Sequence, residues 1–341
     1  MTAWTPPCTE GLRARTRRRA TPLLPCGLLL ALVLGGGVAG CGPRTRAALR
    51  VGITAMPTHE FAYLAQTRGF FKREHVNVRL VEFEYLADAR RAYERGQLDG
   101  CFCTVFEVLQ ARANSERSPR IVRVVDCSQG FDAVLARPGI AAVESLSGRA
   151  VAVEPGSLNL YVLSRALERH RMSLGATRLV GMNPGEMGEA LRTGAVDAAV
   201  TYPPASSAIV TAGLARPIFT SAEIPGEVLD VLAFDASVLA SRRADVDAFV
   251  RAYDEAVAWT AGHRDEAYRI MAAPERITPA ELGASLDTGI ELVSASQQDG
   301  YFSPGGTLPR VVDATSRLLV RTGRSRHLVE PADVLSAPAG N

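Results

Sequence analysis

Two segments of the chain, far apart in the sequence, share one pattern of helix, turn and strand. In residues 92–104 and 190–204 a helix-like stretch ends at a glycine, an aspartate follows three residues later, and a short apolar run ends at a threonine. Glycine adopts the left-handed conformation that closes helices. Strands that are apolar on both faces are typical of buried parallel sheets. The repeat therefore predicts two similar α/β lobes.

The threonine that ends each repeat indicates where a ligand would bind. These residues are Thr104 in the first copy and Thr201 in the second. Ligands of open α/β sheets bind beyond the carboxyl ends of the strands. We therefore expect Thr104 and Thr201 to face one site, each from its own lobe. The alternative is that two ordinary helix–strand units resemble each other by chance.

The composition is that of a globular protein and argues against a nucleic-acid partner. Hydrophobic residues make up 47% and charged residues 22% of 341 residues, which is enough chain for two domains with cores. The formal net charge is +2, but the first forty residues carry five arginines and one glutamate. The remaining chain is slightly acidic, whereas nucleic-acid-binding domains are basic.

Residues 1–40 have the features of an export signal. Arginines precede an apolar run, Leu23–Leu34, which is too short to span a bilayer as a stable helix. The following Val38–Cys41 resembles the lipobox of bacterial lipoproteins, in which the cysteine is lipidated and becomes the new amino terminus. We expect a lipid on Cys41, a tether over residues 41–48, and a protein anchored to the membrane on its extracytoplasmic face. Ordinary signal cleavage nearby is the alternative, and the export route stays open.

Beyond residue 48 the pattern alternates short apolar strands with helices, which is typical of mostly parallel sheets. From residue 238 onward the pattern is mainly helical. We place residues 49–136 and 236–341 in a discontinuous first lobe and 137–235 in the second. The chain then crosses twice between the lobes, and a cleft at such a two-strand hinge closes around its ligand. The main predicted strands are 49–54, 98–103, 121–125, 133–136, 150–153, 177–181, 196–201 and 228–234.

Several short motifs resemble those of one known family and follow one another in the order found there. They are Gly69-Phe70-Phe71 with Val76-Asn77-Val78, Gly96–Asp99, Leu146–Val153 with Gly156-Ser157, residues 190–204 and Ile224-Pro225-Gly226. Over residues 49–272 the chain resembles solute-binding proteins of bacterial ABC importers, in the group that binds alkanesulfonates, nitrate or thiamine-precursor pyrimidines. The resemblance implies the two-lobed, type II periplasmic-binding-protein fold, with helices flanking a mostly parallel sheet in each lobe.

The resemblance also implies a set of ligand contacts. In the family these come from the first loop, the ends of the fourth and fifth strands, and the helix that opens the second lobe. Each contact has a structural alternative: a helix cap for Thr58 and Ser157, a turn for Asp132, a surface position for His59, and packing beneath Pro203 for Tyr202. Carried over, the ligand-binding residues are Met56, Thr58, His59, Thr104, Ser128, Asp132, Ser157, Asn159, Thr201 and Tyr202.

The implied partners are a small-molecule ligand, an ABC permease and its ATPase subunits, for a monomeric receptor without cofactor, metal or catalytic residues. The ligand class stays open. The first loop lacks the asparagine-rich sequence that accompanies pyrimidine ligands. No arginine stands at the end of a predicted strand, where a bidentate anion clamp would need it.

Two other functions are possible. Biosynthetic enzymes of the same fold, of the thiamine-pyrimidine synthase or menaquinone-pathway type, include some that use a histidine in the first loop. His59, Cys101 and Cys103 favour this alternative, and the export signal argues against it. The cysteines at 101 and 103 are predicted as small core residues, and whether either pairs with Cys127 stays open. A sensory lobe would need a transmembrane helix, and none is predicted after Arg44.

Overall fold

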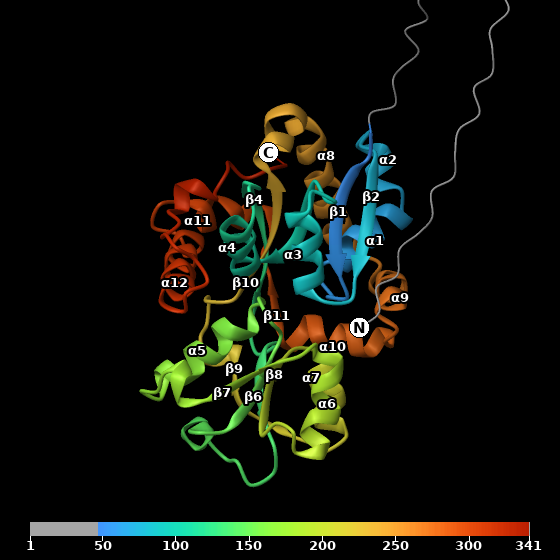
Figure 1. Cartoon of the computed structure of the whole chain (residues 1–341). Helices are drawn as coiled ribbons and strands as arrows, with labels where there is room; N and C mark the ends of the chain where they lie inside the picture. Colours follow the sequence, from blue (N-terminus) through green and yellow to red (C-terminus); the bar gives the residue numbers. More distant parts are fainter. Residues whose placement is uncertain (1–46, 341) are drawn as a thin grey trace, which may run out of the picture. The chain divides into compact units, whose positions relative to one another are not determined.

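The computed structural model describes residues 47–340, which form two β-sheets with helices packed against them (Figure 1). The predicted signal peptide, Cys41 and most of the tether lie outside the described residues. Within residues 47–340, no helix combines the length and the apolar character needed to cross a bilayer.

The first sheet has six strands in the order β11-β4-β10-β3-β1-β2. Strand β1 pairs in parallel with β2 and β3, whereas β10 runs antiparallel between β3 and β4, and β11 is antiparallel to β4. Four of the six strands therefore share one direction. The strands are β1 (Leu49–Thr54), β2 (Val78–Phe83), β3 (Gly100–Thr104), β4 (Pro119–Ser128), β10 (Leu229–Asp235) and β11 (Ile290–Leu292).

The second sheet has five strands in the order β7-β6-β8-β5-β9. Strand β6 is parallel to β7 and β8, and β5 runs antiparallel between β8 and β9. Each of the central strands β5, β6 and β8 is buried at every position, as the lack of alternation predicts. The strands are β5 (Ala133–Ala136), β6 (Ala150–Val153), β7 (Arg178–Gly181), β8 (Ala198–Thr201) and β9 (Arg216–Thr220).

Helices follow most strands, and the C-terminal third is mainly helical, as the sequence predicts. On one face of the first sheet, α8 packs against α1 and α2, with Phe71 and Phe249 stacked at 4.9 Å between ring centroids. The helices are α1 (Glu60–Thr67), α2 (Phe70–Arg73), α3 (Leu86–Glu94), α4 (Val105–Asn114), α5 (Asn159–Arg169), α6 (Pro184–Thr193), α7 (Ala205–Thr211), α8 (Ala236–Thr260), α9 (Arg264–Glu275), α10 (Pro279–Thr288), α11 (Gln298–Phe302) and α12 (Thr307–Arg321).

Two strands belong to the opposite lobe from the one that the sequence predicts. The prediction assigns residues 133–136 to the first lobe and 229–235 to the second. In the structure β5 lies in the second sheet and β10 in the first, so the chain crosses at residues 129–132 and 221–228. The predicted boundaries are therefore wrong by one strand each. Both strands are buried at every position and mainly apolar, so their sequences suit either core.

The repeated pattern anchors one parallel strand in each lobe. Asp99 accepts a hydrogen bond from the backbone N–H of Arg50 at 2.8 Å, and Asp197 accepts one from that of Ala150 at 3.0 Å. In both copies the aspartate's own N–H donates back to the same residue at 2.8 Å. Each aspartate thus fixes the beginning of a strand, β1 or β6, next to the strand that follows the repeat's helix.

Candidate ligand-binding site

Three neighbouring strands of the first sheet place polar side chains in a row at the ends nearest the crossing segments. Thr104 on β3 is in register with Asp230 on β10, and Asp230 with Asp126 on β4. Thr58, in the loop before α1, donates its hydroxyl to Asp126 Oδ2 at 2.6 Å. All four side chains are buried. Sequence reasoning found the two threonines and missed both aspartates, because their position in one row depends on the pairing of β4 and β10, which no local pattern shows.

The carboxyl groups of this row hold protons more tightly than free carboxyls. Burial and the negative charge of Asp126 raise the pKa of Asp230 well above its usual range. Burial likewise raises the pKa of Asp126. Burial also raises the pKa of Asp132 to about 6 and raises that of Glu107. Removal from water disfavours the charged form of a carboxyl group. The close grouping of several carboxyl groups raises their pKa values further.

His59 is neutral and fully buried. Its Nδ1 accepts from the backbone N–H of Thr54 at 3.4 Å and lies 3.0 Å from the Thr54 hydroxyl, which leaves the ring proton on Nε2. Burial lowers the pKa of His59 to about 3. Nε2 has no hydrogen-bond partner among the described residues. The alternative of a surface histidine is therefore wrong.

Ser128 and Asp132 belong to the crossing segments. The Ser128 hydroxyl donates to Asp132 at 2.8 Å and lies 2.6 Å from the hydroxyl of Ser221. The Ser221 hydroxyl in turn accepts the Gly130 N–H at 2.7 Å. These bonds join the two crossings between the lobes. Ser128 is thus engaged in the hinge, while Asp132 also lines the cavity described below.

The predicted residues of the second lobe surround the start of α5 and the end of β8. Asn159 Oδ1 accepts from the backbone N–H of Glu154 at 3.0 Å, while its Nδ2 has no described partner. Ser157 donates to the Glu154 carbonyl at 3.3 Å, so it supports the turn before α5. The hydroxyls of Thr201 and Tyr202 have no hydrogen-bond partner among residues 47–340.

Each lobe extends a glutamate to a helix start in the other lobe. Glu107, on α4, accepts from the backbone N–H of Leu158 at 2.8 Å, immediately before α5. Glu154, after β6, accepts from the backbone N–H of Ala87 at 3.1 Å, in the first turn of α3. Helix amino termini attract anions. The amide just before α5 is therefore occupied by a carboxyl group of the protein itself.

A small inner cavity lies between the lobes, with a volume of about 20 Å³. This is room for about one water molecule. Five of the ten predicted residues line it, and the other five (Thr58, Ser128, Ser157, Asn159 and Thr201) support its walls or the hinge. The lining residues are Thr54, Met56, His59, Leu86, Thr104, Phe131, Asp132, Leu158, Tyr202 and Asp230.

A larger outer cavity of about 550 Å³ shares Thr54 and Tyr202 with the inner one and is lined by both lobes. Its walls include Glu60 at the start of α1 and Glu275 at the end of α9, both buried. Burial and the charges of Glu275 and Glu82 raise the pKa of Glu60 to about 9, and burial raises that of Glu275 to about 8. Sequence reasoning identified neither glutamate, since each lies in an ordinary amphipathic helix.

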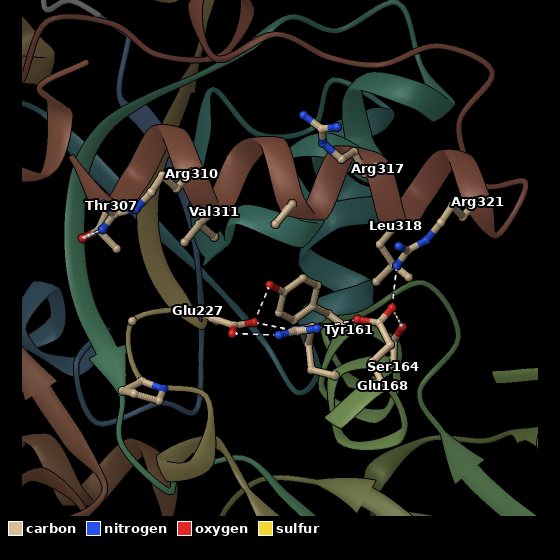
Figure 2. A pocket seen from close by; sticks show the side chains of 14 residues that line it. Tyr161, Ser164, Glu168, Glu227, Thr307, Arg310, Val311, Arg317, Leu318 and Arg321 are labelled. Carbon is tan, nitrogen blue, oxygen red and sulfur yellow. Dashed lines mark hydrogen bonds and ion pairs between the residues drawn. The ribbon is translucent and has the colours of Figure 1, made fainter. Parts of the chain in front are cut away.

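A third hollow, a groove of about 480 Å³ between α5 and α12, is shown in Figure 2. Four of its charged side chains, those of Arg165, Glu168, Glu227 and Arg321, are paired with one another. Arg165 and Tyr161 both donate to Glu227, and Arg321 of α12 donates to Glu168 of α5 at 2.6 Å. The bond between Arg321 and Glu168 thus connects the two lobes beside the second crossing segment. These four charges are satisfied, in contrast to the unpartnered polar atoms at the two cavities of the cleft.

The cysteines among the described residues are free thiols. Cys101 and Cys103 are buried with their sulfur atoms 3.8 Å apart, and Cys127 is buried as well. The hydrogen bond with Cys101 and burial raise the pKa of Cys103, and burial raises that of Cys127 to about 12. Reactive cysteines have a lowered pKa and access to solvent. All three thiols are buried, and the pKa values of Cys103 and Cys127 are raised, not lowered.

Two α/β lobes joined by two crossing segments, with buried polar groups between them, define the periplasmic-binding-protein fold. The chain belongs to the NMT1/THI5-like family, whose model matches residues 56–267. Comparison with curated protein sequences gives no match.

Solved structures share the fold at low sequence identity. The periplasmic aliphatic sulphonate binding protein SsuA from Escherichia coli is 18% identical, with a TM-score of 0.70 over 86% of this chain and 93% of that one. The alkanesulfonate-binding protein SsuA from Xanthomonas axonopodis pv. citri, bound to MOPS, is 18% identical, with a TM-score of 0.70 over 85% and 98%. The desulfurization enzyme DSZB is 15% identical, with a TM-score of 0.63 over 86% and 97%. At these identities the likeness establishes the fold.

Proposed function

We propose that this protein is the solute-binding component of an ABC importer, which captures a small organic molecule between its lobes by hinge closure. The observation that carries the proposal is the reciprocal contact across the cleft, from Glu107 to the Leu158 N–H and from Glu154 to the Ala87 N–H. Both contacts form only when the lobes meet. They enclose unpartnered polar atoms of His59 and Tyr202. A closing site with unsatisfied polar groups suits the capture of a ligand.

The inner cavity is too small for a solute, so binding requires the lobes to part and then close again. The two SsuA proteins are named for sulfonate binding, and that name supports a transport role here without fixing the ligand. We propose an extracytoplasmic location, lipid anchoring through Cys41 and a monomeric receptor that engages a permease and its ATPase subunits.

A catalytic role is the second candidate, because the desulfurization enzyme DSZB has the same fold. It would need an activated nucleophile beside a base. Buried cysteines with raised pKa values and a histidine that does not take up a proton at neutral pH supply neither. We therefore propose a binding protein and not an enzyme.

A thermal-shift screen of the protein from Gly42 onward tests the proposal, after unfolding and refolding to remove any bound ligand. The panel holds sulfonates, nitrate, pyrimidines and small organic amines. A ligand at a hundredfold its dissociation constant adds roughly 2.7 kcal/mol of stability. Stabilisation by any class supports a receptor. Absence of a shift across the whole panel, with the refolded protein giving a cooperative transition, contradicts it.

A further inference from the structure

We infer that the cleft takes a small organic cation, a protonated amine or a quaternary ammonium, because acidic and aromatic side chains line its outer cavity and an unpartnered buried carboxylate faces it. This inference rests on the proposed function and specifies the ligand class of the same site. The cavity is lined by four acidic side chains, all from the first lobe, and by three aromatic rings. These residues are Glu60, Glu82, Glu84, Glu275, Phe83, Tyr85 and Tyr202.

The buried carboxylate is the second observation. Glu60 is 2% exposed, and its Oε2 has no hydrogen-bond partner among the described residues. Oε1 of Glu275 and the Tyr202 hydroxyl are likewise without described partners. Leaving such groups unsatisfied costs free energy that a ligand with donors or positive charge recovers. The basic residue that lines this cavity is Arg276, which is exposed, so solvent and salt screen its charge.

The inner cavity extends the same charge pattern. Asp132 and Asp230 line it, and Asp126 and Glu107 act on Asp230 as neighbouring negative charges. Its lining contains no arginine or lysine, and His59 is uncharged. An oxyanion in this position would meet several acidic groups and no positively charged side chain in the lining. A cation would lower the cost of ionising them.

Two helix-start amides that would attract an oxyanion are already occupied by carboxyl groups of the protein. The Leu158 N–H before α5 is bonded to Glu107, and the Ala87 N–H in α3 is bonded to Glu154. An anion would have to displace one of these carboxylates from a helix start.

The aromatic walls favour an organic cation over a metal ion. Cations on a hydrocarbon body are attracted to the faces of tyrosine and phenylalanine rings. Among residues 47–340, no three histidine, cysteine, aspartate or glutamate side chains are arranged to hold a metal ion. A cavity of about 550 Å³ has room for an amine with a small aliphatic or aromatic body.

The test uses probes that match in shape and differ in charge. Choline is compared with its neutral carbon isostere dimethylbutanol and with the anion isethionate, and benzylamine with benzyl alcohol and benzenesulfonate. Each is added to the stripped protein at one ionic strength, and melting temperature and calorimetric binding are measured. The inference expects a shift with at least one cation and none with its neutral or anionic match. Stabilisation by the anions alone overturns the inference and leaves the proposed function standing, whereas no shift with any probe counts against both.

Glu60→Gln should weaken binding of the stabilising cation by roughly tenfold or more, because it replaces a carboxylate that can take a negative charge. Glu189→Gln is the matched control, since Glu189 is an exposed residue of α6 that pairs with Arg192. The double variant Glu82→Gln with Glu84→Gln changes two exposed carboxylates of the same cavity. Its cation affinity provides a second test if Glu60→Gln fails to fold. Unchanged cation affinity in both cavity variants overturns the inference.

Discussion

Replacing Glu60 by glutamine should change how the stability of the free protein depends on pH. Burial and the charges of Glu275 and Glu82 raise the pKa of Glu60 from 4.5 to about 9. The folded protein therefore keeps a proton that the unfolded chain releases above about pH 4.5. The contribution of this group to the free energy of unfolding is greatest below that pH and falls as the pH rises to about 9.

The size of the effect follows from the shift. Each pH unit in this window costs about 1.4 kcal/mol per proton. Between roughly pH 5 and pH 8, Glu60 should lower the free energy of unfolding by about 4 kcal/mol. Glutamine is neutral throughout, so Glu60→Gln should lose that much less stability over the same range. The variant should thus gain stability relative to the wild type as the pH rises.

Chemical denaturation at several pH values measures this difference directly. The Glu189→Gln variant serves as control, because that side chain is 63% exposed and its removal should leave the slope unchanged. Parallel curves of stability against pH for wild type and Glu60→Gln would refute the claim that Glu60 is a buried, protonated carboxyl at the mouth of the cleft.

Three further outcomes are expected. The affinity for a permanently charged cation such as choline should rise with pH between about 6 and 9, because Glu60 and Glu275 ionise in that range. The rise should be up to tenfold per pH unit for each proton released. Equal affinity across that range, measured by calorimetry, would argue against ionised carboxylates as partners. Thr201→Val should weaken ligand binding while keeping or raising the melting temperature, since the Thr201 hydroxyl is buried without a described partner. Thr104→Val should instead lower the free energy of unfolding by about 1 kcal/mol, because Thr104 caps α4. A Thr201→Val variant less stable than Thr104→Val would contradict these roles. Cys41→Ser should release the protein from membranes, and a variant that stays in the membrane fraction would contradict lipidation at Cys41.

The parts of this fold that depend on nearby residues are predictable from the sequence. The repeat is an example: glycines at 96 and 194 take the left-handed conformation at φ 72° and 77°, and the aspartates follow at a fixed distance. The helix cap at Thr104 also follows from its spacing to Glu107. The hinge boundaries are not predictable in this way, because the sequence of a buried apolar strand such as β5 does not indicate which sheet the strand joins.

The chemistry of the site depends on contacts between residues far apart in the sequence. Glu107 reads as the last member of a capping box, and its bond to the Leu158 N–H appears only when the lobes are placed. The neutral state of His59 and the raised pKa of Glu60 depend on burial, which no local pattern encodes. Sequence reasoning could therefore place the cleft, but it left the ligand open between anions and pyrimidines and did not reveal the acidic character of the cleft.

Hydrogen exchange with and without the most stabilising compound of the probe panel tests the central claim most directly. Binding in the cleft should slow exchange in residues 85–90 and 154–160, where the two lobes meet at Ala87 and Leu158, and leave the groove helix α12 unchanged. Protection confined to α5 and α12, the walls of the groove in Figure 2, would place the ligand outside the cleft and contradict the account.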